Sequence, residues 1–390
     1  MGKRIALIFS IALFTSACSE SGEDASSNTP QGVADAARSV DPPAAPAPDG
    51  GGETTGSEDE TRPDGPAETI PLVASDVSFL IPLRAVNGFG AETTGGHGPL
   101  LPRPYFDRLE ALTRIDDADT IYQNLDVVGV RLDPCFVESH NTVDCESQIR
   151  IVLQPVIGSA DEYAARDATI HAFYRVPRDE LNALAQALAQ LRIDEGGDTV
   201  IGQHPMAASA ADLLLPALGS NRLSRITFVS VHASDEAWSF GGFDVVNGTL
   251  RHHELVGVDD HEQHLTSLGG TETLDASILP EPVIETQAAR FMELYVRDEM
   301  SLDETESAHA GLHRLLDPSV HDTGTVDCAS CHMATASAYF VDGQLGLTIP
   351  DVYANTQNQR MFGYFGTEQS ISPRVNAETE VVLGAFERLR

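Results

Sequence analysis

The 390-residue chain contains 59 Asp and Glu residues against 24 Lys and Arg, so its formal net charge is −35. A chain this acidic is repelled by nucleic acid and by anionic lipid, so the composition argues against both as partners, although it permits a basic protein partner. Residues 70–390 are long enough for one large or two modest folded domains.

Residues 1–17 have the pattern of a secretory signal peptide. Lys3 and Arg4 give a positively charged start, residues 5–14 are an apolar run, and small residues follow. The apolar run is too short for a stable membrane span, and we find no later segment that is long and apolar enough. We therefore expect the chain to be exported.

Cys18 directly follows the small residues, in the sequence Thr15-Ser16-Ala17-Cys18. This tetrapeptide resembles the lipobox of bacterial lipoproteins, in which the cysteine becomes the lipidated N-terminus. Thr15 departs from the pattern, because a leucine is usual there. The resemblance implies a lipid anchor at Cys18, and Ser19 in place of aspartate implies the periplasmic face of the outer membrane. The alternative is an ordinary secretion signal with a chance cysteine.

Residues 18–69 are predicted to be a disordered tether. They are rich in Ser, Gly, Pro, Ala and acidic residues and nearly free of large apolar ones, so burial cannot offset their ordering entropy. Twelve acidic and two basic residues within 19–68 give a net charge of −10. Such a linker is extended and self-repelling, and it would hold a domain off a membrane surface.

Residues 70–284 are predicted to be an α+β domain with a mostly antiparallel sheet. Segments with the β-branched and aromatic content of strands occur at 77–86, 125–132, 148–156, 168–176 and 225–233. Helices are expected over 177–192, where leucines repeat at helical spacing, and over 206–218. Asn247-Gly248 lies between two strand-like runs and predicts a hairpin.

Cys135 and Cys145 lie ten positions apart in this region. In an exported protein we expect a disulfide between them, closing a loop between two strands. A bridge over so short a loop would stabilise the fold by about 2–3 kcal/mol. The alternative is a pair of free buried thiols.

The segment 252–264 is rich in side chains that can bind metal ions. These are His252, His253, Glu254, Asp259, Asp260, His261 and His264. His261 and His264 would share one face if the stretch were helical, which would suit a metal site. The alternative is a polar hairpin edge followed by a loop, which requires no metal.

Residues 285–390 are predicted to be a small, mainly α-helical domain. Helices are expected near 285–298, 302–316 and 376–390, with Asn376 as a helix cap. The region also contains two cysteines, and their spacing says more about function than the predicted helices do.

Cys328, Cys331 and His332 form the pattern C-x-x-C-H. At this spacing two thiols can form thioethers with the two vinyl groups of one porphyrin, and the next residue places an imidazole beneath the iron. The pattern resembles that of c-type cytochromes, and the resemblance covers only the region around 285–390. It implies one covalently attached haem c, held by Cys328 and Cys331 and ligated through His332, in a cytochrome c-like helical domain.

Other readings of the two thiols compete with haem. A thioredoxin-like redox pair usually starts a helix in a βαβ context, which the flanking residues do not match. A zinc site would need further ligands, and His309, His313 and His321 are near in sequence. A disulfide between Cys328 and Cys331 would be strained.

The sixth iron ligand is left open by the sequence. Met361 lies 29 residues beyond His332, and a methionine ligand would raise the reduction potential. His321 would instead give two histidine ligands. A third alternative is an open position that admits small ligands such as peroxide or nitric oxide.

We find no internal repeat, phosphate loop, nucleophile elbow or metalloprotease helix. The motif and the export signal together favour an electron-transfer lipoprotein of the cell envelope, passing electrons to an unidentified redox partner. A peroxidase-like haem enzyme and a redox or gas sensor are the alternatives, so enzymatic activity stays undecided. We expect electron transfer if the haem iron is six-coordinate, whereas an open position on the iron favours the enzyme or the sensor.

Overall fold

The computed structural model describes residues 69–83, 89–113, 117–136, 145–159, 162–202, 207–232, 237–255, 261–266, 301–320, 326–348 and 361–389. They belong to one compact unit, Asp64–Arg390. The predicted signal peptide, Cys18 and nearly all of the predicted tether lie outside the described residues, as does the helix predicted over 285–298.

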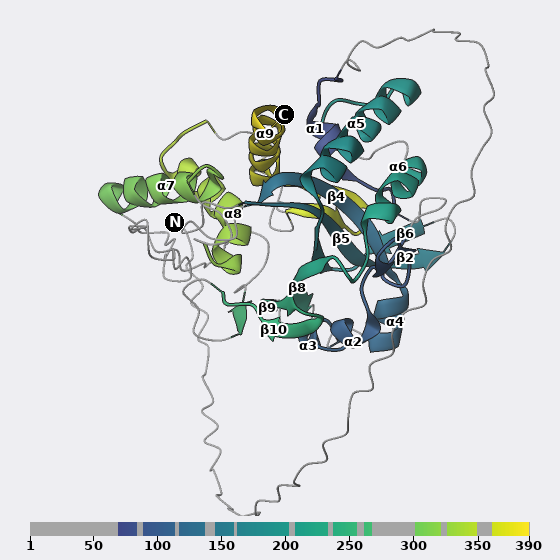
Figure 1. Ribbon diagram of the computed structural model, residues 1–390. Coiled ribbons are helices and arrows are strands. Elements are labelled where there is room, and N and C mark those ends of the chain that lie inside the picture. Colours follow the sequence, from purple (N-terminus) through teal and green to yellow (C-terminus); the bar gives the residue numbers. More distant parts are fainter. Residues whose placement is uncertain are drawn as a thin grey trace, which may run out of the picture. The chain divides into compact units, whose positions relative to one another are not determined.

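Nine strands in the described residues form one sheet, in which every pairing is antiparallel (Figure 1). In spatial order the main strands are β1 (Ser78–Leu80), β4 (Leu125–Phe136), β5 (Glu146–Ser159), β7 (Ala168–Arg175), β8 (Leu223–His232), β9 (Ala237–Val246) and β10 (Thr249–His252). In addition, β6 (Glu162–Ala165) pairs with β5, and β11 (Glu262–Thr266) pairs with β9. The predicted antiparallel α+β architecture is confirmed.

The strands present different side chains to the two faces of the sheet, as the two-residue period requires. In β7, Ile170, Ala172 and Tyr174 belong to the main hydrophobic core. His171 and Phe173 line a cavity instead. The sheet therefore has a core face and a second face, and both are covered.

Helices cover the core face of the sheet. The helix α5 (Arg178–Glu195) packs on β4 and β5, and it contributes Leu181, Leu184 and Leu188 to the core (Figure 1). It ends at Gly196, whose φ of 71° is the left-handed conformation that favours glycine. The predicted helix 206–218 is observed as α6 (Ala207–Leu214) followed by a single 3-10 turn that contains Pro216.

Short elements surround this framework. They are α1 (Ala74–Val77), β2 (Thr94–Gly95), β3 (Gly98–Pro99), α2 (Arg103–Phe106), α3 (Glu110–Thr113) and α4 (Ala118–Gln123). The strand predicted over 77–86 is shorter than expected, because only β1 pairs with β4.

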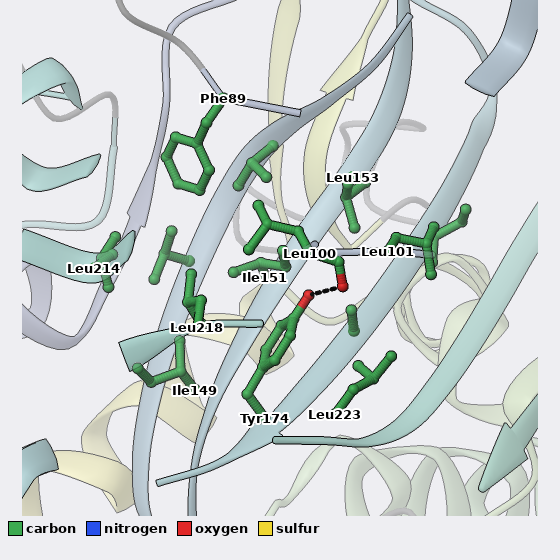
Figure 2. Packing of buried hydrophobic residues seen from close by; sticks show 14 of the residues in the cluster. Phe89, Leu100, Leu101, Ile149, Ile151, Leu153, Tyr174, Leu214, Leu218 and Leu223 are labelled. Carbon is green, nitrogen blue, oxygen red and sulfur yellow. Dashed lines mark hydrogen bonds between the residues drawn. The ribbon is translucent and has the colours of Figure 1, made fainter. Parts of the chain in front are cut away.

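Hydroxyl groups in the core find backbone acceptors: Tyr174 donates to the Leu100 carbonyl at 2.9 Å (Figure 2), and Tyr122 donates to that of Leu101 at 2.7 Å.

Two local predictions agree with the structure. Asn247 and Gly248 have φ angles of 51° and 74° and form the turn between β9 and β10, which is why these residue types were expected there. A disulfide joins Cys135, near the end of β4, to Cys145, directly before β5. It connects two strands that are neighbours in the sheet.

The described residues from 301 onward contain three helices and a hairpin. They are α7 (Leu302–Leu316), α8 (Cys328–Gln344), β12 (Phe362–Phe365), β13 (Glu368–Ile371) and α9 (Pro373–Arg388). The helix α7 matches its prediction. The helix α9 begins earlier than predicted: Ser372, not Asn376, is its cap, and the Ser372 side chain accepts from the Val375 N–H with Pro373 in the first turn.

The structure does not support a separate, mainly helical domain over 285–390. Phe362 and Tyr364 of β12 pack with Val128 and Val152 of the sheet. Phe386 of α9 lies in the main core. These apolar side chains could not be buried within α7 and α8 alone, so the end of the chain completes the sheet domain.

Polar contacts hold this C-terminal segment in register. The Gln154 side chain donates to the Tyr364 carbonyl at 3.0 Å and accepts from the Tyr364 N–H at 2.7 Å. Arg131 of β4 donates to the Val375 carbonyl at 2.8 Å and forms an ion pair with Glu378. Among the described residues, no helix combines the length and apolar character needed to cross a membrane.

Candidate functional site

The first turn of α8 carries all three residues of the C-x-x-C-H motif. Asp327 caps the helix, and its side chain accepts from the Ser330 N–H at 2.9 Å. Gln263 of β11 donates to Asp327 at 2.7 Å and accepts from the Ala329 N–H at 3.0 Å. These bonds fix the start of α8 to the sheet, and sequence reasoning did not single out Gln263.

Apolar and aromatic contacts reinforce this attachment. Ala329 packs in a small cluster with Val229, Trp238 and Phe240. The rings of Phe240 and His332 are 5.1 Å apart between centroids and tilted by 52°. The helix α8 lies beside α7 (Figure 1), and it also contacts β9 and β11 of the sheet.

A cavity lies between the start of α8 and the second face of the sheet. It encloses about 120 Å³ and is partly open to solvent. Cys328, Cys331 and His332 all line it. Its apolar wall includes Phe173 and Val375. The structure thus places all three residues of the predicted motif at one cavity.

His171 lines the same cavity from the centre of the sheet, where it pairs with Thr227 of β8. His171 and His332 also line a second, smaller hollow together with Phe240. Burial holds the pKa of His171 well below its ordinary value, and the charge of Arg150 adds to the effect. The imidazole is therefore neutral at pH 7, so one ring nitrogen keeps a lone pair.

Of the two predicted candidates for the sixth iron ligand, the structure describes only one. Met361 lines the cavity and directly precedes β12, with a φ of 59°. His321 lies outside the described residues. His253 also lines the cavity, and its ring nitrogen lies 3.1 Å from Asp244. Sequence reasoning missed His171 because a lone histidine in a strand gives no spacing signal.

The structure argues against the predicted alternatives for the two cysteines. Cys328 and Cys331 are not bonded to each other. Burial, followed by the charge of Asp327, raises the pKa of Cys328 to about 12, and burial raises that of Cys331. Redox pairs of the thioredoxin type need a lowered thiol pKa.

A zinc site that combines these cysteines with His309 and His313 is contradicted by the geometry. Both histidines contact Asp342, near the other end of α8. Asp342 is eleven residues beyond Cys331, which is about 16 Å along a helix. His309 and His313 therefore cannot share an ion with the thiols.

The cavity also has a charged side. Arg150, Arg225 and Arg374 line it, against Asp327 and Glu378. The Nε of Arg150 is buried and has no hydrogen-bond partner among the described residues. A buried N–H without an acceptor is rare in folded proteins and marks a place where an anionic ligand group would fit.

Glu378 is the carboxylate that balances these arginines. Arg374 Nε lies 2.9 Å from its side chain and Arg150 Nη2 lies 3.9 Å away, while Arg131 also pairs with it. Burial alone would raise the pKa of Glu378, but the three positive charges outweigh it and lower the pKa to about 2.

The histidine-rich segment does not converge on one ion in the part of the chain that the structure describes. His252 and His261 stack with centroids 4.1 Å apart, whereas His253 turns to Asp244 and His264 to Ser239 at 3.0 Å. Residues 262–266 form strand β11 rather than a helix, so His261 and His264 do not share a helix face. Asp259 and Asp260 lie outside the described residues.

No protein-family model, curated protein or solved structure matches this chain. The chemistry of the cavity therefore has to follow from the set of side-chain groups that line it. That set contains two thiols and an imidazole in one helical turn, further imidazoles, a thioether and a buried guanidinium. Such a mixture suits a ligand that is apolar over most of its surface, holds a metal and carries a negative charge.

Proposed function

We propose that the cavity binds one haem c, with Cys328 and Cys331 as the thioether residues and His332 as an iron ligand. The observation that carries the proposal is the position of the three motif residues, which line one cavity together with the neutral imidazole of His171. When bound, the haem would supply one-electron oxidation and reduction.

The residues around the motif fit the rest of such a group. Phe173 and Val375 offer apolar contacts for the faces of the porphyrin. Haem also carries two propionate carboxylates, and the buried Arg150 Nε–H is an unused donor for one of them. Arg225 and Arg374 add positive charge at the same cavity.

His171 is our first candidate for the second axial position. It lies on the central strand β7, where two neighbouring strands hold its backbone. Met361 is the second candidate, and it would give a higher reduction potential than a second histidine. His253 is less suitable because its ring is already hydrogen-bonded to Asp244.

A site with two protein ligands favours electron transfer over chemistry on a bound small molecule. The peroxidase-like and sensing alternatives require an open position, whereas this cavity offers two further donors, His171 and Met361. The Cys135–Cys145 disulfide supports export to an oxidising compartment, in keeping with a lipid anchor at Cys18. The acidic chain suits a basic redox partner.

Absorption spectroscopy tests the electron-transfer assignment. The full chain would be produced together with a cytochrome c maturation system, and spectra recorded in both oxidation states, with and without carbon monoxide. We expect low-spin, six-coordinate spectra that carbon monoxide leaves unchanged. A high-spin spectrum that shifts with carbon monoxide or peroxide would contradict electron transfer and favour an enzyme or a sensor.

A further inference from the structure

Asp342, His309 and His313 form a second cluster with ligand chemistry, distant from the cavity along α8. His309 Nδ1 lies 2.7 Å from Asp342 Oδ1, and His313 Nε2 lies 3.1 Å from Asp342 Oδ2. One nitrogen from each imidazole and one carboxylate oxygen all lie within 4.8 Å of one another. The three side chains thus point toward one spot between α7 and α8.

The sequence explains why they converge. His309 and His313 are four residues apart on α7, so they lie on one face of the helix, and their ring centroids are 4.3 Å apart. Asp342 extends from α8, which packs beside α7. Histidine pairs at this spacing are a common way to place two imidazoles on one metal ion.

The carboxylate of the cluster is buried. The Asp342 side chain is 5% exposed, and within the described residues it forms no ion pair with Lys or Arg. Burial of an uncompensated carboxylate is costly, whereas a divalent cation would balance it.

The dimensions also suit a small transition-metal ion. Zinc bonds of about 2.0–2.2 Å in a tetrahedral site place ligand atoms about 3.3 Å apart. The contacts from His309 and His313 to Asp342 are already close to this value, and both imidazoles are about one-third exposed, so they can adjust. Their exposure leaves room for water in the remaining positions.

We infer that His309, His313 and Asp342 bind one divalent transition-metal ion, with Zn²⁺ as the expected occupant under ordinary supply. The ion would link α7 to α8, the helix that carries the C-x-x-C-H motif. This inference does not depend on haem binding, because the two sites share no residue.

Zinc titration of the full chain, after chelator treatment and dialysis, tests the inference. Binding would be followed by competition with a chromogenic chelator and by elemental analysis for zinc. We expect one Zn²⁺ per chain, with His309→Gln and His313→Gln each weakening that binding at least tenfold. The matched control is His264→Gln, an exposed histidine elsewhere, which should leave both stoichiometry and affinity unchanged.

Two results would overturn the inference. One is a chelator-treated chain without substitutions that binds no Zn²⁺ at micromolar concentration, in which case the cluster is only a hydrogen-bonded contact between helices. The other is full retention of zinc affinity in both His309→Gln and His313→Gln. Circular dichroism of each variant establishes that it is folded, and Asp342→Asn, which keeps the shape of the side chain, should lose zinc binding in the same way.

Discussion

The role of His171 can be inferred only from the face of the sheet on which it lies. The alternation of residues 168–175 predicts a strand, and so it predicts that His171 lies opposite Ile170 and Ala172. It does not predict what covers that second face, because α8 comes more than 150 residues later. Local sequence patterns therefore could not predict that α8 lines the same cavity as His171.

Replacing His171 by Ala should change the axial state of the iron. If His171 occupies the second axial position, the low-spin spectrum becomes high-spin and carbon monoxide gains access. The matched variant Met361→Leu, which keeps the volume of the side chain, should leave the spectrum unchanged. Absorption spectra of both variants check this prediction. The opposite pattern, with only Met361→Leu changing the spectrum, would contradict the choice of His171.

At the scale of elements, the start of α8 is determined by one local contact and one distant one. Asp327 is a residue type that caps helices, so its bond to the Ser330 N–H could have been anticipated from sequence. The bonds from Gln263 could not, because that residue comes from β11, 64 positions earlier than Asp327. The orientation of the motif toward the cavity depends on this second contact.

The ion pair of Glu378 with Arg131 joins α9 to β4. Because the folded-state pKa of Glu378 is about 2, below its ordinary value of 4.5, its ionised form stabilises the fold. The contribution is complete above about pH 5 and is lost as pH falls through 4.5 toward 2. Its full size is about 3 kcal/mol at most.

Urea unfolding from pH 6 to pH 2 tests this linkage. We expect Glu378→Gln to be less stable than the unmodified chain at pH 6, since it leaves Arg131 and Arg374 without their carboxylate. The two free energies of unfolding should converge as pH approaches 2. A difference that stays constant across this range would show that Glu378 does not act through its charge. Exposed Glu387→Gln on the same helix is the control.

For the whole molecule, local sequence signals identify most strands of the sheet, but they do not identify β6, β11 or the C-terminal hairpin. Strand-like segments and the Asn247-Gly248 turn carry local signals, and these elements were predicted. Phe362 and Tyr364 were not placed, because their partners Val128 and Gln154 lie more than 200 positions away. A short apolar run near Met361 is ambiguous until the sheet it packs on is known, so a separate helical domain was expected there.

The distribution of charge over the whole molecule favours the same kind of ligand as the C-x-x-C-H motif does. The chain has a net charge of −35. Yet three arginines and only two carboxylates line the cavity, and one arginine N–H there lacks an acceptor. Placing scarce positive charge around a cavity favours an anionic ligand inside it, which agrees with a haem and its propionates.

Intact-protein mass spectrometry under denaturing conditions tests the central claim most directly. The full chain and a Cys328→Ala, Cys331→Ala double variant would be produced beside a cytochrome c maturation system, with a known c-type cytochrome as a positive control. We predict the mass of the unmodified chain plus one haem, and the mass of the double variant without haem. A haem-free mass for the unmodified chain, from cells that load the control cytochrome, would contradict the assignment.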